Sequence, residues 1–250
     1  MSVVAIIPAR YASTRFPGKP LANSTGKSLI QHVYEAVSGA RLVDRVVVAT
    51  DDERIADAVR AFGGEAIMTR RDHNTGTDRV AEAAGRINAD LIVNVQGDEP
   101  EMEPEAVDTL VELMQSRPEA PMGSLACRFT SRDDLHNPAC VKVVIDEAGN
   151  ALYFSRSLIP YPRDTAGEAD DPGRWLLHLG IYAYRRDFLL ELSSMPPTEL
   201  EQVEQLEQLR ALYGGYKIAM ALVERASTGI DTPEQYQAFV VRYRAGVSSP

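Results

Sequence analysis

Short, continuous apolar runs alternate with helical patterns through the first 115 residues, and this alternation constrains the fold more than any other feature. An apolar run without polar alternation predicts a strand that is buried on both faces. Strands of this kind, each followed by a helix, predict a doubly wound α/β fold with a parallel sheet. The expected strands occupy residues 3–7, 45–50, 65–68 and 91–95, and the expected helices 28–40, 51–62, 78–88 and 104–115.

The second half has fewer helices between its strand-like segments, which lie at 123–127, 141–145, 152–154 and 175–184. Residues 164–174 have the composition of a loop. Helical patterns return at 199–213 and 233–245. The spacing in 199–213 predicts a buried face and a polar face that is solvated or lines a pocket, namely Val203, Leu206 and Leu209 against Glu204, Glu207 and Gln208.

The length of 250 residues allows one large domain or a domain with a subdomain. No Ser-, Gly- or Pro-rich linker, internal repeat or low-complexity tract separates the two halves. We therefore expect one globular unit with a nucleotide-type first half and a substrate-binding second half.

The composition limits the partners that the chain can have. Its 36 acidic and 26 basic side chains give a formal charge of −10, which argues against nucleic acid and anionic membranes because both bind cationic surfaces. Cys127 and Cys140 are too few for a disulfide framework or a zinc site, which predicts buried reduced thiols. The N-terminus lacks the pattern of a signal peptide, and no run reaches the ~20 apolar residues of a membrane helix. We expect a soluble, cytoplasmic protein.

A cluster of cations follows the first predicted strand. Arg10, Arg15 and Lys19 lie within the segment PARYASTRFPGKPL (8–21), at the end of the strand where open α/β sheets bind ligands. Guanidinium groups can hold two phosphate oxygens at once, and an ammonium group acts as a mobile point charge. The spacing is that of neither a P-loop nor a G-x-G-x-x-G turn. We interpret the segment as a polyphosphate-binding loop, in preference to a solvated basic loop.

A pair of carboxylates, Asp98 and Glu99, follows the strand at 91–95 in the segment VNVQGDEP. Mg²⁺ takes one or two carboxylates in proteins and completes its octahedron with phosphate oxygens and water. The alternative is an aspartate that caps a helix or a turn. Asp98 lies at the end of the sheet that faces the basic loop, so we prefer the interpretation as a metal ligand.

Weaker signals lie elsewhere. The segment HNTGTDR (73–79) precedes a helix and suits a base edge or a phosphate, but it also fits an ordinary capping turn, and its His73 alone is more typical of a surface histidine. Arg156 would suit a substrate carboxylate, and His178 a sugar hydroxyl or carboxylate. Asp231 would suit a second metal position. Taken singly, each of these patterns is more typical of a structural role.

Together and in order, these segments resemble those of the 3-deoxy-manno-octulosonate (Kdo) cytidylyltransferases, also called CMP-Kdo synthetases. The resemblance spans residues 3 to about 238, and the first motif alone is also similar to wider sugar nucleotidyltransferases. One departure is Thr75, where the family usually has serine, which keeps the hydroxyl and adds a methyl group. The matching segments are PARYASTRFPGKPL, ATDDERI, HNTGTDR, VNVQGDEP, NPACVKVV, LYFSR, HLGIYAY, LEQLRALYGG and GIDTPEQ.

The resemblance implies transfer of CMP from CTP to the anomeric hydroxyl of Kdo, with release of pyrophosphate, which activates Kdo for lipopolysaccharide synthesis. It implies a glycosyltransferase-A-like α/β fold in three layers with a mostly parallel sheet and a smaller substrate and dimerisation subdomain. The single catalytic domain, 1–250, would bind nucleotide mainly through 1–120 and would bind sugar and dimerise mainly through 121–250. A Mg²⁺ requirement and a homodimer are also implied.

The resemblance further implies a role for each matching residue. CTP would be bound by Ala9, Arg10, Arg15, Lys19, Thr75, Gly76, Arg79 and Gln96. The acid sugar would be bound by Gln96, Arg156, His178, Tyr182, Glu207 and Gln208. Catalysis would depend on Lys19, Arg15, Asp98 and Asp231, with the two aspartates as the metal ligands.

The expected mechanism is an in-line attack by the anomeric oxygen of Kdo on the α-phosphorus of CTP, which depends on positioning and charge neutralisation. Residues 164–174 and 195–205 match the family weakly. Two alternatives therefore stay open. One is a cytidylyltransferase for another acid sugar, such as 8-amino-3,8-dideoxy-manno-octulosonate or a sialic acid. The other is a nucleotide-binding module without catalysis.

Overall fold

The computed structural model describes residues 1–12, 15–165 and 171–247, and the chain forms two compact units. The first unit comprises Met1–Asp108 with Ser227–Pro250, and the second comprises Thr109–Ala226. The C-terminal segment therefore returns to the first unit, whereas the binding roles expected of 1–120 and 121–250 stay predictions. No helix in the described part of the chain combines the length and the apolar character needed to cross a membrane.

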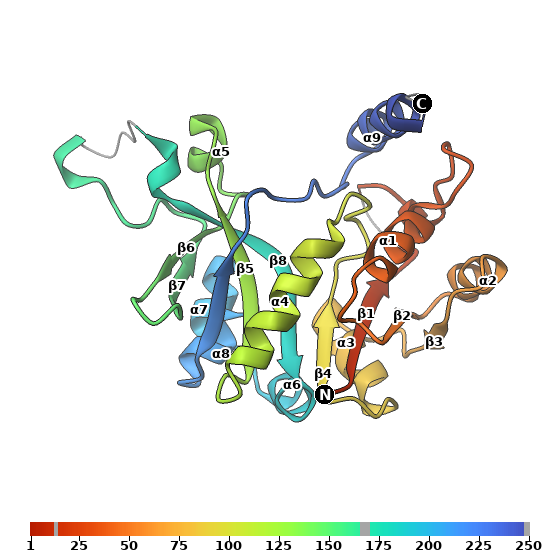
Figure 1. The fold of residues 1–250 in the computed structure, drawn as a ribbon, viewed down its shortest axis with the longest axis horizontal. Coiled ribbons are helices and arrows are strands. Elements are labelled where there is room, and N and C mark those ends of the chain that lie inside the picture. The colour runs from red at the N-terminus through yellow and green to blue at the C-terminus, as the bar shows by residue number, and fades with distance from the viewer. Residues whose placement is uncertain (13–14, 166–170, 248–250) are drawn as a thin grey trace. The chain divides into compact units, whose positions relative to one another are not determined.

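The first unit is built on a parallel sheet in the order β3-β2-β1-β4 (Figure 1). Its strands are β1 (Val3–Ala9), β2 (Arg45–Thr50), β3 (Ala66–Met68) and β4 (Leu91–Asn94). Most side chains of β1, β2 and β4 are buried, as continuous apolar runs require, whereas those of the short edge strand β3 are partly exposed. The chain moves outward from β1 to β3 and then crosses back to β4. The carboxyl ends of β1 and β4 therefore form the switch point where α/β sheets bind ligands.

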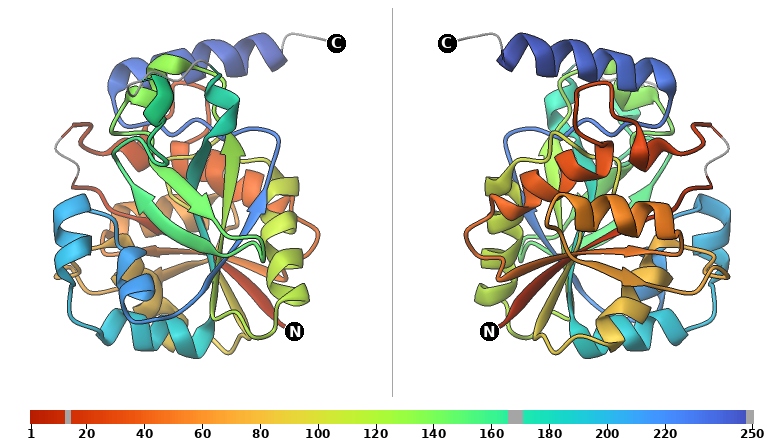
Figure 2. Two further views of the ribbon diagram at one scale, coloured as in Figure 1. Left: turned by 90° about the vertical axis from the view of Figure 1, so that its left-hand side faces the viewer. Right: turned by 90° about the vertical axis from the view of Figure 1, so that its right-hand side faces the viewer.

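Helices join these strands, and the alternation can be followed in the colour order of Figure 2. They are α1 (Leu29–Ser38), α2 (Glu53–Ala61) and α3 (Gly76–Gly85). Right-handed crossovers place α1 and α2 on one face of the sheet and α3 on the other. The helix α9 (Pro233–Val247) packs on the start of α1 through an apolar cluster of Leu29, Ile230, Tyr236, Phe239 and Val240. The helix α4 (Pro104–Ser116) carries the chain from the first unit into the second.

The second unit has a mixed sheet. Its strands are β5 (Met122–Arg128), β6 (Lys142–Ile145), β7 (Ala151–Ser155), β8 (Leu176–Arg185) and β9 (Ile218–Leu222). The strand β5 lies between β8, which is antiparallel to it, and β9, which is parallel, while β6 pairs with β7 and β8. The helices are α5 (Arg132–His136), α6 (Arg186–Ser194), α7 (Glu199–Glu204) and α8 (Leu209–Tyr213), with short 3₁₀ turns at Arg163–Thr165 and Pro172–Arg174.

The expected α/β fold with a mostly parallel sheet is confirmed, but the continuous helix expected at 199–213 is wrong. Gln205 adopts a left-handed conformation, with φ 53° and ψ 49°, and divides this segment into α7 and α8. Because the helical phase is lost there, Val203 is 77% exposed instead of buried, whereas Leu206 and Leu209 are buried as expected. The sequence patterns also missed β9, α5 and α6.

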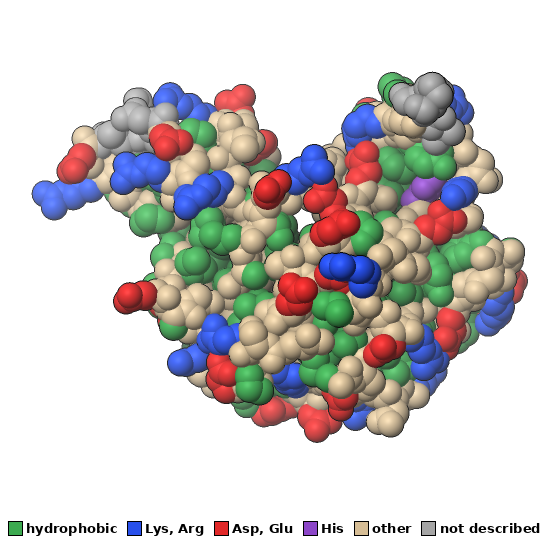
Figure 3. All heavy atoms as spheres, in the orientation of Figure 1, with side chains coloured by type: hydrophobic (Ala, Val, Ile, Leu, Met, Phe, Trp, Pro, Cys, Tyr) green, Lys and Arg blue, Asp and Glu red, His purple; other side chains and the backbone are tan. Residues whose placement is uncertain are grey.

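Both cysteines carry free thiols, with Cys127 buried and Cys140 partly buried. Burial raises the pKa of both thiols, which keeps them protonated and unreactive. The negative charge is not gathered in one place on the face drawn in Figure 3, where acidic and basic side chains are interspersed. A positively charged site for an anionic ligand therefore depends on the local arrangement of basic side chains.

Candidate active site

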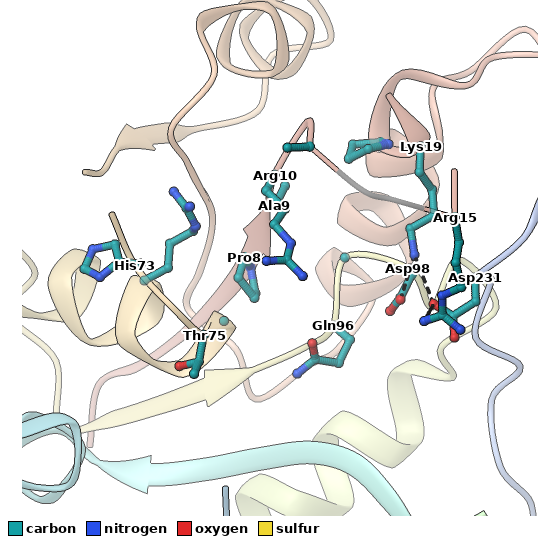
Figure 4. Close-up of a pocket in the computed structure, with 15 residues that line it drawn as sticks. Pro8, Ala9, Arg10, Arg15, Lys19, His73, Thr75, Gln96, Asp98 and Asp231 are labelled. Atoms are coloured by element: carbon teal, nitrogen blue, oxygen red, sulfur yellow. Dashed lines mark hydrogen bonds and ion pairs between the residues drawn. The ribbon is translucent and has the colours of Figure 1, made fainter. Parts of the chain in front are cut away.

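A pocket of about 450 Å³ opens in the first unit beyond the carboxyl ends of β1 and β4 (Figure 4). The lining includes every first-unit residue that the sequence predicted for the site, together with Pro8, Ala12, Pro20, His73 and Gly97. The predicted residues among them are Ala9, Arg10, Arg15, Lys19, Thr75, Gly76, Arg79, Gln96, Asp98 and Asp231. The structure thus brings together segments that lie far apart in the sequence.

Two glycines shape the backbone around the pocket. A Cβ atom at Gly97 would lie 2.7 Å from the carbonyl oxygen of Pro8, so only glycine lets the turn after β4 approach the end of β1 this closely. Gly18 has φ +71° and donates its N–H to the carbonyl of Tyr11 at 3.0 Å. This left-handed conformation suits glycine and begins the 3₁₀ turn Lys19–Leu21 within the basic loop.

The ammonium group of Lys19 lies between two carboxylates (Figure 4). Its Nζ atom is 2.9 Å from Oδ2 of Asp98 and 3.6 Å from Oδ1 of Asp231, and it donates a hydrogen bond of 2.6 Å to the carbonyl of Ile230. Arg15 reaches the same oxygen of Asp231 at 3.0 Å. The side chain of Lys19 is 13% exposed, whereas that of Arg15 is 65% exposed. Asp98 and Asp231 therefore converge on one cation, and Asp98 faces the basic loop as predicted.

Asp231 reaches the pocket because the segment 227–231 is held against the turn after β4. The N–H of Ile230 donates to the carbonyl of Asp98 at 2.8 Å, and the hydroxyl of Ser227 donates to Oε2 of Glu99 at 2.6 Å. Burial raises the pKa of Glu99 to about 7, despite the hydrogen bond from Ser227, and the neighbouring charge of Asp98 adds to the shift. Of the two carboxylates singled out in the sequence, Asp98 lines the pocket and Glu99 anchors the C-terminal segment.

The opposite end of the pocket lies at the start of α3. Thr75 caps this helix, because its Oγ1 accepts the N–H of Asp78 at 3.1 Å, so the capping interpretation of the segment is confirmed. Arg79 is buried and lies 3.2 Å from the carboxylate of Asp51 at the end of β2. These contacts fix both side chains at the pocket wall.

His73 lines the same end, and its side chain is only 7% exposed, which differs from the surface position expected of it. Its Nε2 lies 2.5 Å from Oε2 of Glu82 on α3. The local sequence pattern does not reveal this position of His73, because its partner Glu82 lies nine residues away on a helix whose packing the pattern does not show.

Two predicted sugar-binding residues lie together on β8 of the second unit. The ring of His178 is 4.8 Å from that of Phe154 and 5.4 Å from that of Tyr182, between ring centroids. Burial lowers the pKa of His178 to about 3, so the imidazole is neutral at physiological pH. Its Nε2 lies 3.1 Å from the hydroxyl of Ser124, which itself donates to the carbonyl of Ile181.

Gln96, predicted to bind both substrates, lines the first-unit pocket, and the other second-unit residues predicted to bind the sugar lie around the end of α7. The Arg156 guanidinium donates to three main-chain carbonyls, those of Glu204 at 2.7 Å, Pro138 at 2.9 Å and Gln205 at 3.2 Å. Glu207 is partly buried and Gln208 is buried. The structure thus places the second-unit residues in two groups, and their roles in binding stay predictions.

Among the residues that the structure describes, no three His, Cys, Asp or Glu side chains form a metal-binding group. Asp98 and Asp231 converge on one cation, which suits an ion that takes its remaining ligands from phosphate and water.

Known proteins match this chain along almost all of its length. The cytidylyltransferase family matches residues 4–218. The 3-deoxy-manno-octulosonate cytidylyltransferase of Geobacter sulfurreducens is 54% identical over 243 residues, which cover 95% of this chain and 97% of the relative. The corresponding protein of Pelobacter propionicus is 51% identical and covers 98% of each chain. These matches confirm the family resemblance that the motifs predicted.

Solved structures of cytidylyltransferases also resemble this chain. A CMP:2-keto-3-deoxy-manno-octonic acid synthetase in complex with CTP has a TM-score of 0.92 and 44% identity, covering 98% of this chain and 100% of that chain. A 4-diphosphocytidyl-2C-methyl-D-erythritol synthase from Anaerococcus prevotii, at 12% identity and a TM-score of 0.62, shares the fold alone.

Proposed function

Because the chain belongs to the cytidylyltransferase family, among the 3-deoxy-manno-octulosonate cytidylyltransferases, we propose that it transfers CMP from CTP to the anomeric hydroxyl of Kdo. The products are CMP-Kdo and pyrophosphate, and CMP-Kdo supplies activated Kdo for lipopolysaccharide synthesis. The observation that carries the proposal is the convergence of Lys19 and Arg15 on Asp98 and Asp231 at the switch point of the sheet.

The reaction is an in-line displacement at phosphorus. The anomeric oxygen of Kdo forms a bond to the α-phosphorus of CTP while the bond from that phosphorus to the bridging oxygen breaks. Pyrophosphate leaves with the bonding electrons, and the hydroxyl proton passes to solvent. Lys19, Arg15 and Arg10 line the pocket and would balance the charge of the triphosphate, while Thr75 and Arg79 at the other end would hold the nucleoside. Such catalysis depends on positioning and charge neutralisation.

Mg²⁺ fits this site. The carboxylates of Asp98 and Asp231 already approach one cation, the ammonium of Lys19, from two sides. They would hold the ion, and Lys19 would then be free to turn toward phosphate oxygens. When bound, Mg²⁺ supplies Lewis-acid stabilisation of the phosphate charge and lowers the pKa of a coordinated hydroxyl.

A panel of substrates tests the proposal. Pyrophosphate release is measured for CTP, UTP, ATP and GTP, each with Kdo, 8-amino-3,8-dideoxy-manno-octulosonate and a sialic acid, at saturating Mg²⁺. We expect release only with CTP and Kdo. Release with CTP and another acid sugar alone would identify a different acceptor, and no release with any combination would favour a nucleotide-binding module.

We also propose a homodimer in the cytoplasm, where CTP is made. The second unit exposes large apolar side chains that a partner copy would cover, including Leu152 (59% exposed), Tyr161 (64%) and Tyr213 (67%). Sedimentation equilibrium tests the dimer, and a concentration-independent monomer mass would contradict it. Cell fractionation tests the location.

A further inference from the structure

A dense set of hydrogen bonds in the second unit joins the end of β7 to the end of α7. The carboxylate of Glu204 accepts the hydroxyl of Ser155 at 2.6 Å through Oε1 and the N–H of Arg156 at 2.9 Å through Oε2. In return, Nε of Arg156 donates to the carbonyl of Glu204 at 2.7 Å. Hydrogen bonds with a charged partner are roughly twice as strong as neutral ones. We call Ser155, Arg156, Glu204 and Gln205 the Glu204 junction.

The Glu204 junction holds an unusual backbone turn. Gln205 is the only described non-glycine residue with a positive φ, 53°. A side chain in this region costs roughly 1–2 kcal/mol, so the surrounding contacts must hold the residue there. The guanidinium of Arg156 donates to the carbonyl of Gln205 at 3.2 Å. The junction therefore fixes the point at which α7 ends and the chain turns toward α8.

The other side of the Arg156 guanidinium is also anchored. It donates to the carbonyl of Pro138 at 2.9 Å. The same loop is held by Lys142, which is fully buried and donates to the carbonyls of Asn137 at 3.2 Å and Cys140 at 2.8 Å. Two cations thus fix the loop, and Arg156 connects this support to the turn at Gln205.

Gln208 lies three residues beyond the turn. It is 4% exposed, and its Nε2 has no hydrogen-bond partner among the described residues. A buried donor without an acceptor costs about 1–3 kcal/mol, and a ligand oxygen would remove this cost. The next residue, Leu209, is fully buried and holds the main chain of Gln208 on one side. The position of Gln208 therefore depends on the turn at Gln205 on the other side.

We propose that Glu204 is a positioning residue for acid-sugar binding, which acts by fixing the turn at Gln205 and thereby the amide of Gln208. The proposal rests on the proposed function, because it takes the acid sugar as the ligand of Gln208. It assigns the Arg156 guanidinium chiefly to the same junction, since three of its N–H groups are engaged by main-chain carbonyls.

The test compares Glu204→Ala with Glu204→Gln, which keeps one acceptor oxygen. The control is Glu199→Gln, since Glu199 is exposed on the same helix. KM is measured separately for CTP and for the acid sugar that the wild-type protein uses. Loss of one charge-assisted hydrogen bond corresponds to roughly a tenfold change in an equilibrium constant. We expect Glu204→Ala to raise KM for the sugar about tenfold, with a smaller rise for Glu204→Gln. KM for CTP should stay within about twofold in all three variants.

A double-mutant cycle with Gln208→Ala separates positioning from general destabilisation. If Glu204 acts through Gln208, the double variant should have nearly the same KM for the sugar as Gln208→Ala alone. An unchanged KM for the sugar, equal changes in both KM values or additive effects in the cycle would overturn the proposal. If Glu204→Ala does not fold, Glu204→Gln and Ser155→Ala provide the same comparison. A wild-type protein that is inactive with every acid sugar would overturn the proposed function itself.

Discussion

The cations at the pocket of the first unit and those at the 137–140 loop of the second unit have different partners. In the first unit, Lys19 and Arg15 lie against carboxylates and line a pocket. In the second unit, the side chains of Arg156 and Lys142 donate their hydrogen bonds to main-chain carbonyls. The first arrangement mainly balances charge against charge, with one further bond from Lys19 to the carbonyl of Ile230, whereas Arg156 and Lys142 use their charge to fix the backbone.

This difference indicates which cations are available to a ligand. A carboxylate can exchange its ammonium partner for a metal ion, and the released ammonium can bind phosphate, so no charge is left unpaired. A carbonyl offers no such exchange, because removing its donor leaves a polar group unsatisfied. We therefore expect substitutions around Lys19 to change turnover more than stability, and substitutions of buried charges in the second unit to do the reverse.

The largest effect is expected at Asp98. Asp98→Asn keeps the shape of the side chain but removes half of the charge that faces Lys19 and would hold Mg²⁺. Loss of one such electrostatic contact lowers kcat by about 10²–10³-fold. Pyrophosphate release at saturating Mg²⁺ measures the effect. Asp57→Asn is the control, because the side chain of Asp57 is 68% exposed on α2. Near-normal turnover of Asp98→Asn would show that the carboxylate pair is not the catalytic centre.

The next effect is a loss of stability in the second unit. Glu201 and Arg210 are both buried, with Nε of Arg210 at 2.8 Å from Oε2 of Glu201. Glu201→Ala leaves a buried guanidinium without its anion, which costs about 3–5 kcal/mol of the free energy of unfolding. Urea denaturation measures it. Arg15→Gln in the first unit should cost less than about 1 kcal/mol, because that ion pair is exposed. Equal losses in the two variants would remove the contrast between the units.

The third effect is a pH dependence set by His178. Burial lowers its pKa to about 3 in the folded protein, below the ordinary 6.5 of the unfolded chain. As the pH falls below 6.5, His178 therefore takes up a proton in the unfolded protein but stays neutral in the folded protein. From pH 6.5 to pH 5, this lowers the free energy of unfolding by about 1.5–2 kcal/mol. His178→Gln should lose that contribution, so its stability should fall less over the same range. Parallel pH profiles of the two proteins in urea denaturation would argue against a buried, neutral histidine.

The sequence predicts the first unit well because continuous apolar runs mark its buried strands β1, β2 and β4. The apolar run at 45–50 becomes β2, Arg45–Thr50, and Asp52 caps α2 by accepting the N–H of Arg54. The basic loop and Asp98 are found for the same reason. Both follow buried strands, and the carboxyl ends of parallel strands meet at one edge of a sheet.

The second unit is harder to predict because contacts distant in sequence decide its turns. The pattern of 199–213 is helical throughout, but the helix is broken at Gln205. Hydrogen bonds from Ser155 and Arg156, about 50 residues earlier in the chain, hold Glu204 and Gln205 at this break. The contact of Ser227 with Glu99, 128 residues apart, likewise has no local signal. The motifs indicated that Asp231 belongs to the site, but only the fold shows that contacts of the segment 227–231 with the turn after β4 place it there.

The central claim is the formation of a bond between the anomeric oxygen of Kdo and the α-phosphorus of CTP. Kdo labelled with ¹³C at the anomeric carbon, incubated with the protein, CTP and Mg²⁺, tests it directly by NMR. We expect a new anomeric ¹³C signal that is coupled to one ³¹P nucleus, with one pyrophosphate released for each labelled product. Consumption of CTP without a ¹³C–³¹P coupling, or no consumption at all, would contradict it.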